Sequence, residues 1–218
     1  MGGLLVTTGE CGESVRRRCA PLCIVLAIFV AGCEITPEKK AAAVNDINRE
    51  FRAEYERILA ERGTRVFKVG RNEAFDAMRA TMLRLGMQIA DQDPALGTLN
   101  VYGVPDAAAP KPLTPPEWRQ AAEADLPRAR EIIRRHLGPI IAGFFNFEPE
   151  GLAIVMNVTI LETRAGSEIS LTMRMRETAP PKSDLPRREY PPPTAVRMGL
   201  DKIWAQFEQE LRAAPRRS

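Results

Sequence analysis

A long alternation of apolar and polar side chains near the C-terminal end constrains the fold of this chain most strongly. Two apolar sets, each with a residue at every second position, flank a turn at residues 165–167. The apolar positions are Leu152, Ile154, Met156, Val158 and Ile160 before the turn, and Ile169, Leu171, Met173 and Met175 after it. Because successive strand residues point to opposite faces of a sheet, this spacing predicts a β-hairpin with one buried face and one increasingly polar face.

The end of the chain predicts a helix that can cover the buried face of this hairpin. The helix opens at residues 191–194, and its apolar residues recur at helical steps with Trp204 beside them. These residues are Val196, Leu200, Ile203, Phe207 and Leu211. Such a stripe must be buried against another element, so we expect Leu200, Ile203 and Phe207 to pack on the apolar face of the hairpin.

Shorter elements of both kinds precede the hairpin and make the predicted fold α+β. Residues 65–69 read as a strand, Asn72 caps a helix that ends at Gly86, and strands at 87–90 and 98–102 flank a turn rich in helix and strand breakers. Asp91 and Asp93 in this turn have the spacing of the first ligands of a calcium loop. The later ligands and the terminal Glu of such a loop are missing, so a structural turn is favoured over a metal site.

Residues 36–63 predict a long amphipathic helix ahead of these elements. Thr36 and Pro37 suit the N-cap and the first helical position, and Gly63 suits the C-terminal stop. One interpretation is a helix that lies on a membrane or binds a partner, and the other is a helix that covers part of its own domain. The polar face carries both signs of charge, unlike a helix on an anionic lipid surface, and this favours the second interpretation.

The region at 103–150 interrupts the α+β pattern. Residues 103–116 hold five prolines and an alanine run, which predicts an extended linker. Thr114 and Glu117 then have the spacing of a capping box, and Pro127 either kinks or restarts the helix that begins there. Residues 143–147 form the most aromatic stretch, with Phe144, Phe145 and Phe147. This stretch is either an exposed docking loop or pocket lid, or a strand that closes the core, and the usual burial of apolar clusters favours the strand.

The first 32 residues have the organisation of a secretory signal peptide. Arg16, Arg17 and Arg18 precede an apolar run at 21–30, which is about half as long as a membrane-spanning helix. Val30-Ala31-Gly32-Cys33 resembles the lipobox of bacterial lipoproteins. This resemblance implies cleavage before Cys33, acylation of Cys33 and anchoring of the chain to a membrane, facing the periplasm. Residue 34 is Glu and not the Asp that often retains such proteins at the inner membrane of enteric bacteria, so the outer membrane is favoured.

Cleavage before Cys33 would leave little of the chemistry that most enzymes use. Cys11, Cys19 and Cys23 lie in the signal peptide, and Cys33 takes the lipid, so the mature chain would have no thiol. His136 is the only histidine, and it reads as a solvated residue near a helix end. Phosphate-binding loops, dinucleotide fingerprints and nucleophile elbows are missing, and the net charge of +3 is far from that of dedicated nucleic-acid binders. We therefore expect no catalysis, no cofactor, no metal and no nucleic-acid partner.

Residues 72–101 resemble a segment of the BamC-type lipoproteins. The shared pattern is a helix from Asn72, a Leu85-Gly86 turn, an Asp-rich turn at 91–93 and a strand after Gly97-Thr98. The resemblance implies a helix-grip domain, in which a curved antiparallel sheet wraps on a long helix, and a place in outer-membrane protein assembly. The expected organisation is a signal peptide at 1–32, a tether and amphipathic helix at 33–63, and one helix-grip-like α+β domain at 64–214. This domain carries the proline-rich helical insert at 103–150, and it is single where BamC-type proteins have two.

Two non-catalytic functions fit these observations. The first is an interaction module with a protein partner in assembly or maintenance of the envelope, and the second is a carrier or sensor of an apolar ligand held between helix and sheet. Methionines at core spacing favour the first. Arg174 and Arg176 on the polar hairpin face, with Arg187 and Arg188 after a proline-flanked loop, form a candidate patch for carboxylates or phosphates. The alternatives are a solvated face balanced by nearby glutamates, and binding through the aromatic stretch at 144–147.

Overall fold

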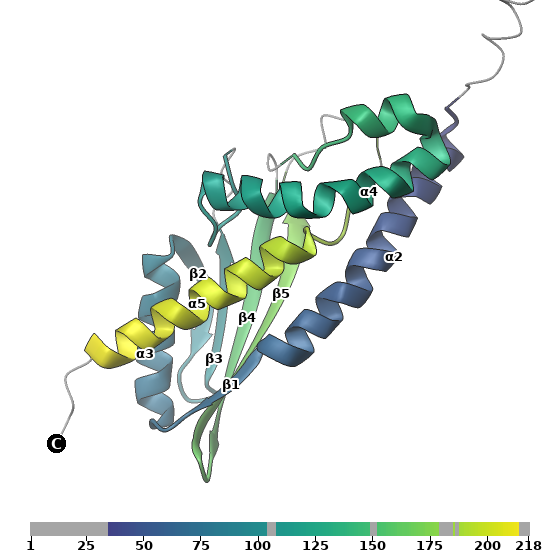
Figure 1. Ribbon diagram of the computed structural model, residues 1–218. Helices are drawn as coiled ribbons and strands as arrows, with labels where there is room; N and C mark the ends of the chain where they lie inside the picture. The colour runs from purple at the N-terminus through teal and green to yellow at the C-terminus, as the bar shows by residue number, and fades with distance from the viewer. Residues whose placement is uncertain (1–34, 104–107, 149–151, 179–184, 186–187, 214–218) are drawn as a thin grey trace, which may run out of the picture. The chain divides into compact units, whose positions relative to one another are not determined.

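The computed structural model describes residues 35–103, 108–148, 152–178, 185 and 188–213 (Figure 1). Residues from Pro37 onward form one compact unit. Along the described chain the elements are α2 (Pro37–Arg62), β1 (Thr64–Phe67), α3 (Arg71–Arg84), β2 (Met87–Asp93), β3 (Thr98–Gly103), α4 (Pro115–Phe144), β4 (Leu152–Thr163), β5 (Gly166–Glu177) and α5 (Pro193–Ala213). The predicted signal peptide, Cys33 and Arg187 lie outside the described residues.

The strands form one antiparallel sheet, which confirms the predicted α+β class. The strand order is β1-β5-β4-β3-β2. The predicted hairpin is confirmed as β4 and β5, which pair along their whole length from Leu152 opposite Glu177 to Thr163 opposite Gly166. The hairpin occupies the middle of the sheet because β1 adds to one side and the β3 and β2 pair adds to the other.

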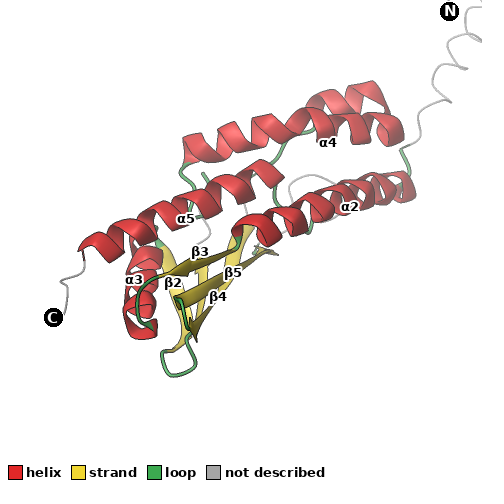
Figure 2. Cartoon of the chain, turned by 60° about the horizontal axis from the view of Figure 1, so that its bottom comes forward, coloured by secondary structure: helices red, strands yellow, loops and turns green. Residues whose placement is uncertain are grey.

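The helices gather on one side of the sheet. Figures 1 and 2 show α5 crossing the strands with α2, α3 and α4 on the same side, and no described element covers the opposite face. Buried residues of α2, α3 and α5 share a single cluster with the inward side chains of the sheet. Each strand therefore has a covered face toward the helices and an uncovered face toward solvent.

The C-terminal helix packs in the core as predicted. Leu200, Ile203 and Phe207 are buried in the same cluster as the apolar residues of β4 and β5. The Phe207 ring lies 4.8 Å from that of Phe67 in β1, and Trp204 Nε1 donates a hydrogen bond of 2.8 Å to the Arg62 carbonyl at the end of α2. These contacts attach α5 to β1 and to the end of α2, in addition to the hairpin.

The long N-terminal helix covers its own domain, which confirms the favoured interpretation. Ile47, Phe51, Tyr55 and Ile58 are buried, and the last two belong to the main cluster. Helix α2 is therefore part of the same compact unit as the sheet. The sequence predicts a boundary between segments at residue 63. Residues on both sides of this position contribute to the same core.

The insert departs from the prediction in two respects. Helix α4 continues through Pro127, and its interruption is at Gly138, where φ is 86° and ψ is 169°. A proline supplies a helical φ and removes one donor, whereas a positive φ ends the helical path, so the glycine and not Pro127 bends this element.

The segment before α4 also differs from the predicted extended linker. Pro110, Pro112 and Leu113 are buried, so this part of the segment is packed into the domain. The capping box is confirmed, because the Thr114 N–H donates to Glu117 at 2.7 Å.

The first residue of α3 and the last residue of β2 also differ from the sequence prediction. Helix α3 begins at Arg71 with Gly70 as its N-cap, and not with Asn72. Strand β2 extends to Asp93, whose carboxylate accepts a 3.0 Å hydrogen bond from the Leu96 N–H. This contact makes the Asp-rich segment a strand end and a structural turn, as the favoured interpretation held.

Candidate functional site

The uncovered face of the sheet is a polar surface that spans all five strands. The pairing register aligns its side chains in rows that cross the strands. One row holds Thr64, Ser170, Thr159 and Thr98, the next holds Thr172, Asn157, Asn100 and Asp91, and a third holds Arg174, Val155, Tyr102 and Gln88. The face therefore presents hydroxyl and amide groups in register, and we call this side of the sheet, with Arg176 just beyond the third row, the open face.

The open face carries positive charge at one end. Arg174 and Arg176 are exposed and lie two residues apart on β5, so they project from the same side of the sheet. Within the face, the Thr64 and Ser170 hydroxyls lie 3.0 Å apart, and the Tyr102 hydroxyl hydrogen-bonds Gln88. Guanidinium groups beside uncharged donors and acceptors suit a partner with carboxylates and backbone amides.

Arg188 does not extend this patch of exposed arginines. Its guanidinium carbon lies 5.1 Å from the centre of the Phe147 ring and 5.9 Å from that of Phe145. Arg188 therefore contacts the aromatic stretch, which was the other predicted binding candidate. Of the four predicted arginines, the structure places Arg174 and Arg176 together on the open face and Arg188 on the aromatic rings.

The aromatic stretch divides into buried and exposed parts, and the predicted strand is wrong. Phe144 ends α4, and the residues after it have no regular secondary structure. Phe145 and Phe147 are buried, with ring centres 5.5 Å apart, and the Phe147 ring lies 5.9 Å from that of Phe51 in α2. Phe144 is 85% exposed. The aromatic stretch therefore contacts α2 through Phe147, and the described chain next joins the sheet at Leu152, where β4 begins.

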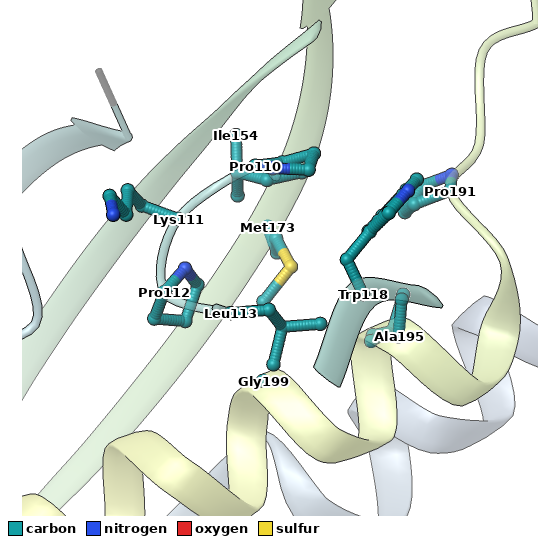
Figure 3. A pocket seen from close by; sticks show the side chains of 11 residues that line it. Pro110, Lys111, Pro112, Leu113, Trp118, Ile154, Met173, Pro191, Ala195 and Gly199 are labelled. Atoms are coloured by element: carbon teal, nitrogen blue, oxygen red, sulfur yellow. The ribbon is translucent and has the colours of Figure 1, made fainter. Parts of the chain in front are cut away.

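A small apolar pocket lies between the insert and the sheet (Figure 3). The pocket is lined by the insert, the sheet and the start of α5 with the loop before it. The lining residues are Pro110, Lys111, Pro112, Leu113 and Trp118 of the insert, Ile154 and Met173 of the sheet, Pro191 of the loop, and Ala195, Val196 and Gly199 of α5. The cavity volume is about 10 Å³, which holds about one water molecule. The pocket is therefore narrow in its present form.

The indole of Trp118 gives this pocket its single unsatisfied polar group. The side chain is 4% exposed, and Nε1 has no hydrogen-bond partner in the structure as described. An unpaired buried donor costs free energy comparable to a lost hydrogen bond. A water molecule needs two to four polar partners, which apolar walls do not supply. An acceptor atom on an otherwise apolar ligand would satisfy this N–H.

Charged residues hold the helices around the pocket. Glu117, next to Trp118, accepts a 2.6 Å hydrogen bond from Lys202 of α5. Burial raises the pKa of Glu117, but hydrogen bonds from Lys202 and Thr114 outweigh that effect and lower this pKa to about 2. Asp125 accepts a 2.7 Å hydrogen bond from the Thr194 N–H at the start of α5, and burial raises the pKa of its carboxyl. These pairs fix α4 against α5.

His136 has a partner that the sequence did not reveal. Its Nε2 lies 2.8 Å from the carboxylate of Asp46 in α2, so the expectation of a solvated histidine is wrong. The hydrogen bond to His136 is the main reason that the pKa of Asp46 is lowered. Arg128 also joins α4 to α2 through Glu50 and Glu54. Only the antiparallel packing of α4 on α2 brings these residues together, and no local motif marks them.

No cluster of three or more metal-binding side chains occurs among the described residues. Within the same ranges, no helix has the length and apolar character needed to cross a membrane. Comparison with known proteins gives no match, either to a protein-family model or to a curated protein sequence.

Proposed function

We propose that the chain is a lipid-anchored envelope protein that acts as a non-catalytic interaction module through its open face. The single observation that carries this proposal is the segregation of all described helices to one side of the sheet, which leaves the rows of the other side uncovered. The lipobox-like Val30-Ala31-Gly32-Cys33 supports the anchor, and the outer membrane facing the periplasm is the proposed location.

The open face fits a polar protein partner better than a small substrate. Its side chains are spread over five strands instead of converging in a cleft, and its hydroxyl and amide groups suit many weak hydrogen bonds. Arg174 and Arg176 would orient an acidic segment of the partner by bidentate pairing. The residues that resemble BamC-type lipoproteins form α3, β2 and β3, and a role in outer-membrane protein assembly is the form of this function that the resemblance favours.

Crosslinking in intact cells tests the interaction module. A photoreactive residue at Thr172 would lie on the open face, and one at the exposed Ala124 of α4 serves as the matched control. We expect a specific envelope protein to crosslink at position 172 and not at position 124, and the yield to fall several-fold in the Arg174→Glu/Arg176→Glu chain. Unchanged crosslinks in the charge-reversed chain, with its fold intact by circular dichroism, would contradict the proposal.

Intact mass measurement tests the anchor separately. Cleavage before Cys33 with acylation gives a mature chain that carries the mass of two or three acyl groups, whereas Cys33→Ser stays unprocessed or unacylated. Two or more acyl chains hold a protein to membranes through washing with high salt, whereas one chain is marginal. An unmodified N-terminus elsewhere in the chain would remove the anchor from the proposal.

The Trp118 pocket favours a second candidate, the binding of an apolar ligand. The cavity volume of about 10 Å³ is far below the 300–1,000 Å³ usual for ligand pockets. Only one end of a larger ligand would enter, and the pocket walls would have to move apart to admit it. Its acceptor would pair with Trp118 Nε1. Native mass spectrometry of the purified mature chain would reveal a retained ligand, and Trp118→Phe should release it while keeping the apolar wall. A bare mass for the native chain would contradict this candidate.

A further inference from the structure

The short helical segment after Gly138 presents two large apolar side chains to solvent. Ile140 is 74% exposed and Phe144 is 85% exposed, the highest values among the large apolar residues of the described chain. They are four positions apart on α4, so they lie on the same side of the segment. Ala142 and Phe145 are buried, so the segment already uses its other side for packing. Ile140 and Phe144 therefore form an exposed apolar surface that is not buried by the packing of the described domain.

The surface is held in a fixed position on α2. Arg130 Nε donates a hydrogen bond of 3.1 Å to the Phe145 carbonyl, which ties the end of the segment back to the first part of α4. Phe147 packs against Phe51, and His136 pairs with Asp46 just before the bend. The direction in which Ile140 and Phe144 point is therefore set by the domain.

The pair lies at the end of the domain where α2 begins. Arg128 of α4 pairs with Glu50 and Glu54, whereas His136 pairs with Asp46, so α4 advances toward the start of α2. Figures 1 and 2 both place the bend of α4 and the start of α2 at one end of the domain. The turn of the β4 and β5 hairpin lies at the opposite end (Figure 1).

The proposed lipid anchor brings this end to the membrane. Cys33 precedes Pro37, the first residue of α2, by four positions. An extended chain spans at most about 3.6 Å per residue, so α2 begins within about 14 Å of an acylated Cys33. The exposed Arg134 and Arg135 precede the bend. Arg134 pairs with Glu131 at 2.7 Å, and Arg135 is the arginine of the two that better suits an anionic headgroup.

We propose that Ile140 and Phe144 enter the interfacial layer of the lipid bilayer beside the acylated Cys33 and thereby orient the domain. The inference rests on the anchor of the proposed function. The occupant of this surface is lipid, because a short tether keeps the surface at the bilayer and because apolar side chains flanked by arginines partition into the region between headgroups and acyl chains. In this orientation the β4 and β5 turn points away from the membrane.

Site-specific labelling can measure the depth of this surface. The mature acylated chain has no free thiol, so a cysteine introduced by Phe144→Cys is the only site for an environment-sensitive fluorophore such as nitrobenzoxadiazole. The matched control is Leu96→Cys. Leu96 is 68% exposed and precedes Thr98, which pairs with Thr159 near the hairpin turn. The acylated proteins are incorporated into vesicles of phosphatidylethanolamine and phosphatidylglycerol.

We expect the label at position 144 to shift to shorter wavelength and to gain fluorescence several-fold on the vesicles. Lipids that carry a spin label high in the acyl chain should quench it. The label at position 96 should keep its emission in water on the same vesicles. In a second pair of measurements the label is attached at Gly143→Cys, which is exposed, in the otherwise native chain and in the Ile140→Ser/Phe144→Ser chain. The spin-labelled lipids should quench the label only in the otherwise native chain.

The outcomes separate this inference from the anchor. A chain that is acylated and attached to vesicles, but whose label at 144 remains in water, overturns the orientation and leaves the anchor intact. A label at 144 that responds only when envelope proteins are added also overturns it, because the surface would then bind a protein. An unacylated chain that does not attach overturns the inference together with the anchor.

Discussion

The two faces of the sheet are built from alternate residues of the same strands, but they differ in what they contact. On the covered face, Met156 and Leu171 are buried beneath the helices. On the open face, their neighbours Asn157 and Thr172 lie opposite one another and are exposed. The covered face therefore holds the buried contacts that stabilise this domain, whereas substitutions on the open face should cost little stability.

The largest expected difference between the faces comes from Phe207. Phe207→Ala removes a buried ring from the covered side, and we expect a loss of roughly 3 to 5 kcal/mol in the free energy of unfolding. Thr172→Ala on the open face should change it by less than about 0.5 kcal/mol. Urea denaturation of both variants measures the difference. An unchanged midpoint for Phe207→Ala would mean that α5 is peripheral to the core.

A smaller effect is expected from the hydrogen bond that joins α5 to α2. Trp204→Phe removes the donor to the Arg62 carbonyl and part of a buried ring, so we expect a loss of about 1 to 3 kcal/mol. Thermal and urea unfolding should report the same loss. A variant as stable as the native chain would show that the covered side does not depend on this link between helices.

Glu117 tests an ion pair on the helix side of the domain. Glu117→Gln keeps an acceptor for the capping box but removes the charge that pairs with Lys202, so we expect a loss of about 0.5 to 1 kcal/mol at neutral pH. Because the folded pKa is about 2 and the ordinary value is 4.5, the native chain should lose this contribution as the pH falls from 4.5 to 2. The stability difference between the two chains should then disappear. A difference that persists at pH 2 would assign it to packing and not to charge.

The smallest effect on stability is expected on the open face. Arg174→Glu with Arg176→Glu changes two exposed side chains, and the free energy of unfolding should shift by no more than about 0.5 kcal/mol. The same substitutions should nevertheless lower the crosslink yield of this face several-fold. Strong destabilisation would mean that the two arginines support the fold. It would contradict the claim that side chains of the open face contribute little to stability.

The features that the sequence predicted are those set by short-range periodicity. Alternation fixed the hairpin of Leu152–Thr163 and Gly166–Glu177, and helical spacing placed Leu200, Ile203 and Phe207 against it. Both patterns are local, and both persist because burying the apolar side chains is the dominant gain in folding. The resulting covered and open faces follow from the same alternation.

The features that the sequence missed depend on contacts between distant residues. Pro127 looked like the site of a bend, yet α4 continues through it, and the residue with non-helical backbone angles is Gly138. Asp46 and His136 are 90 positions apart, so no motif predicts their pairing. The unpaired Trp118 indole likewise depends on which segments surround it. For the candidate site, the pattern placed Arg174 and Arg176 on one face but not Arg188 on the aromatic rings.

The most direct test of the open face as a binding surface is a comparative crosslinking map in living cells. Photoreactive residues are placed one at a time at Asn157 and Thr172 on the open face, and at Ala124 and Glu123 on the exposed side of α4. We expect both open-face positions to capture the same envelope protein and neither α4 position to do so. Capture of that protein from α4 alone, or equally from both sides, would contradict a binding role for the open face.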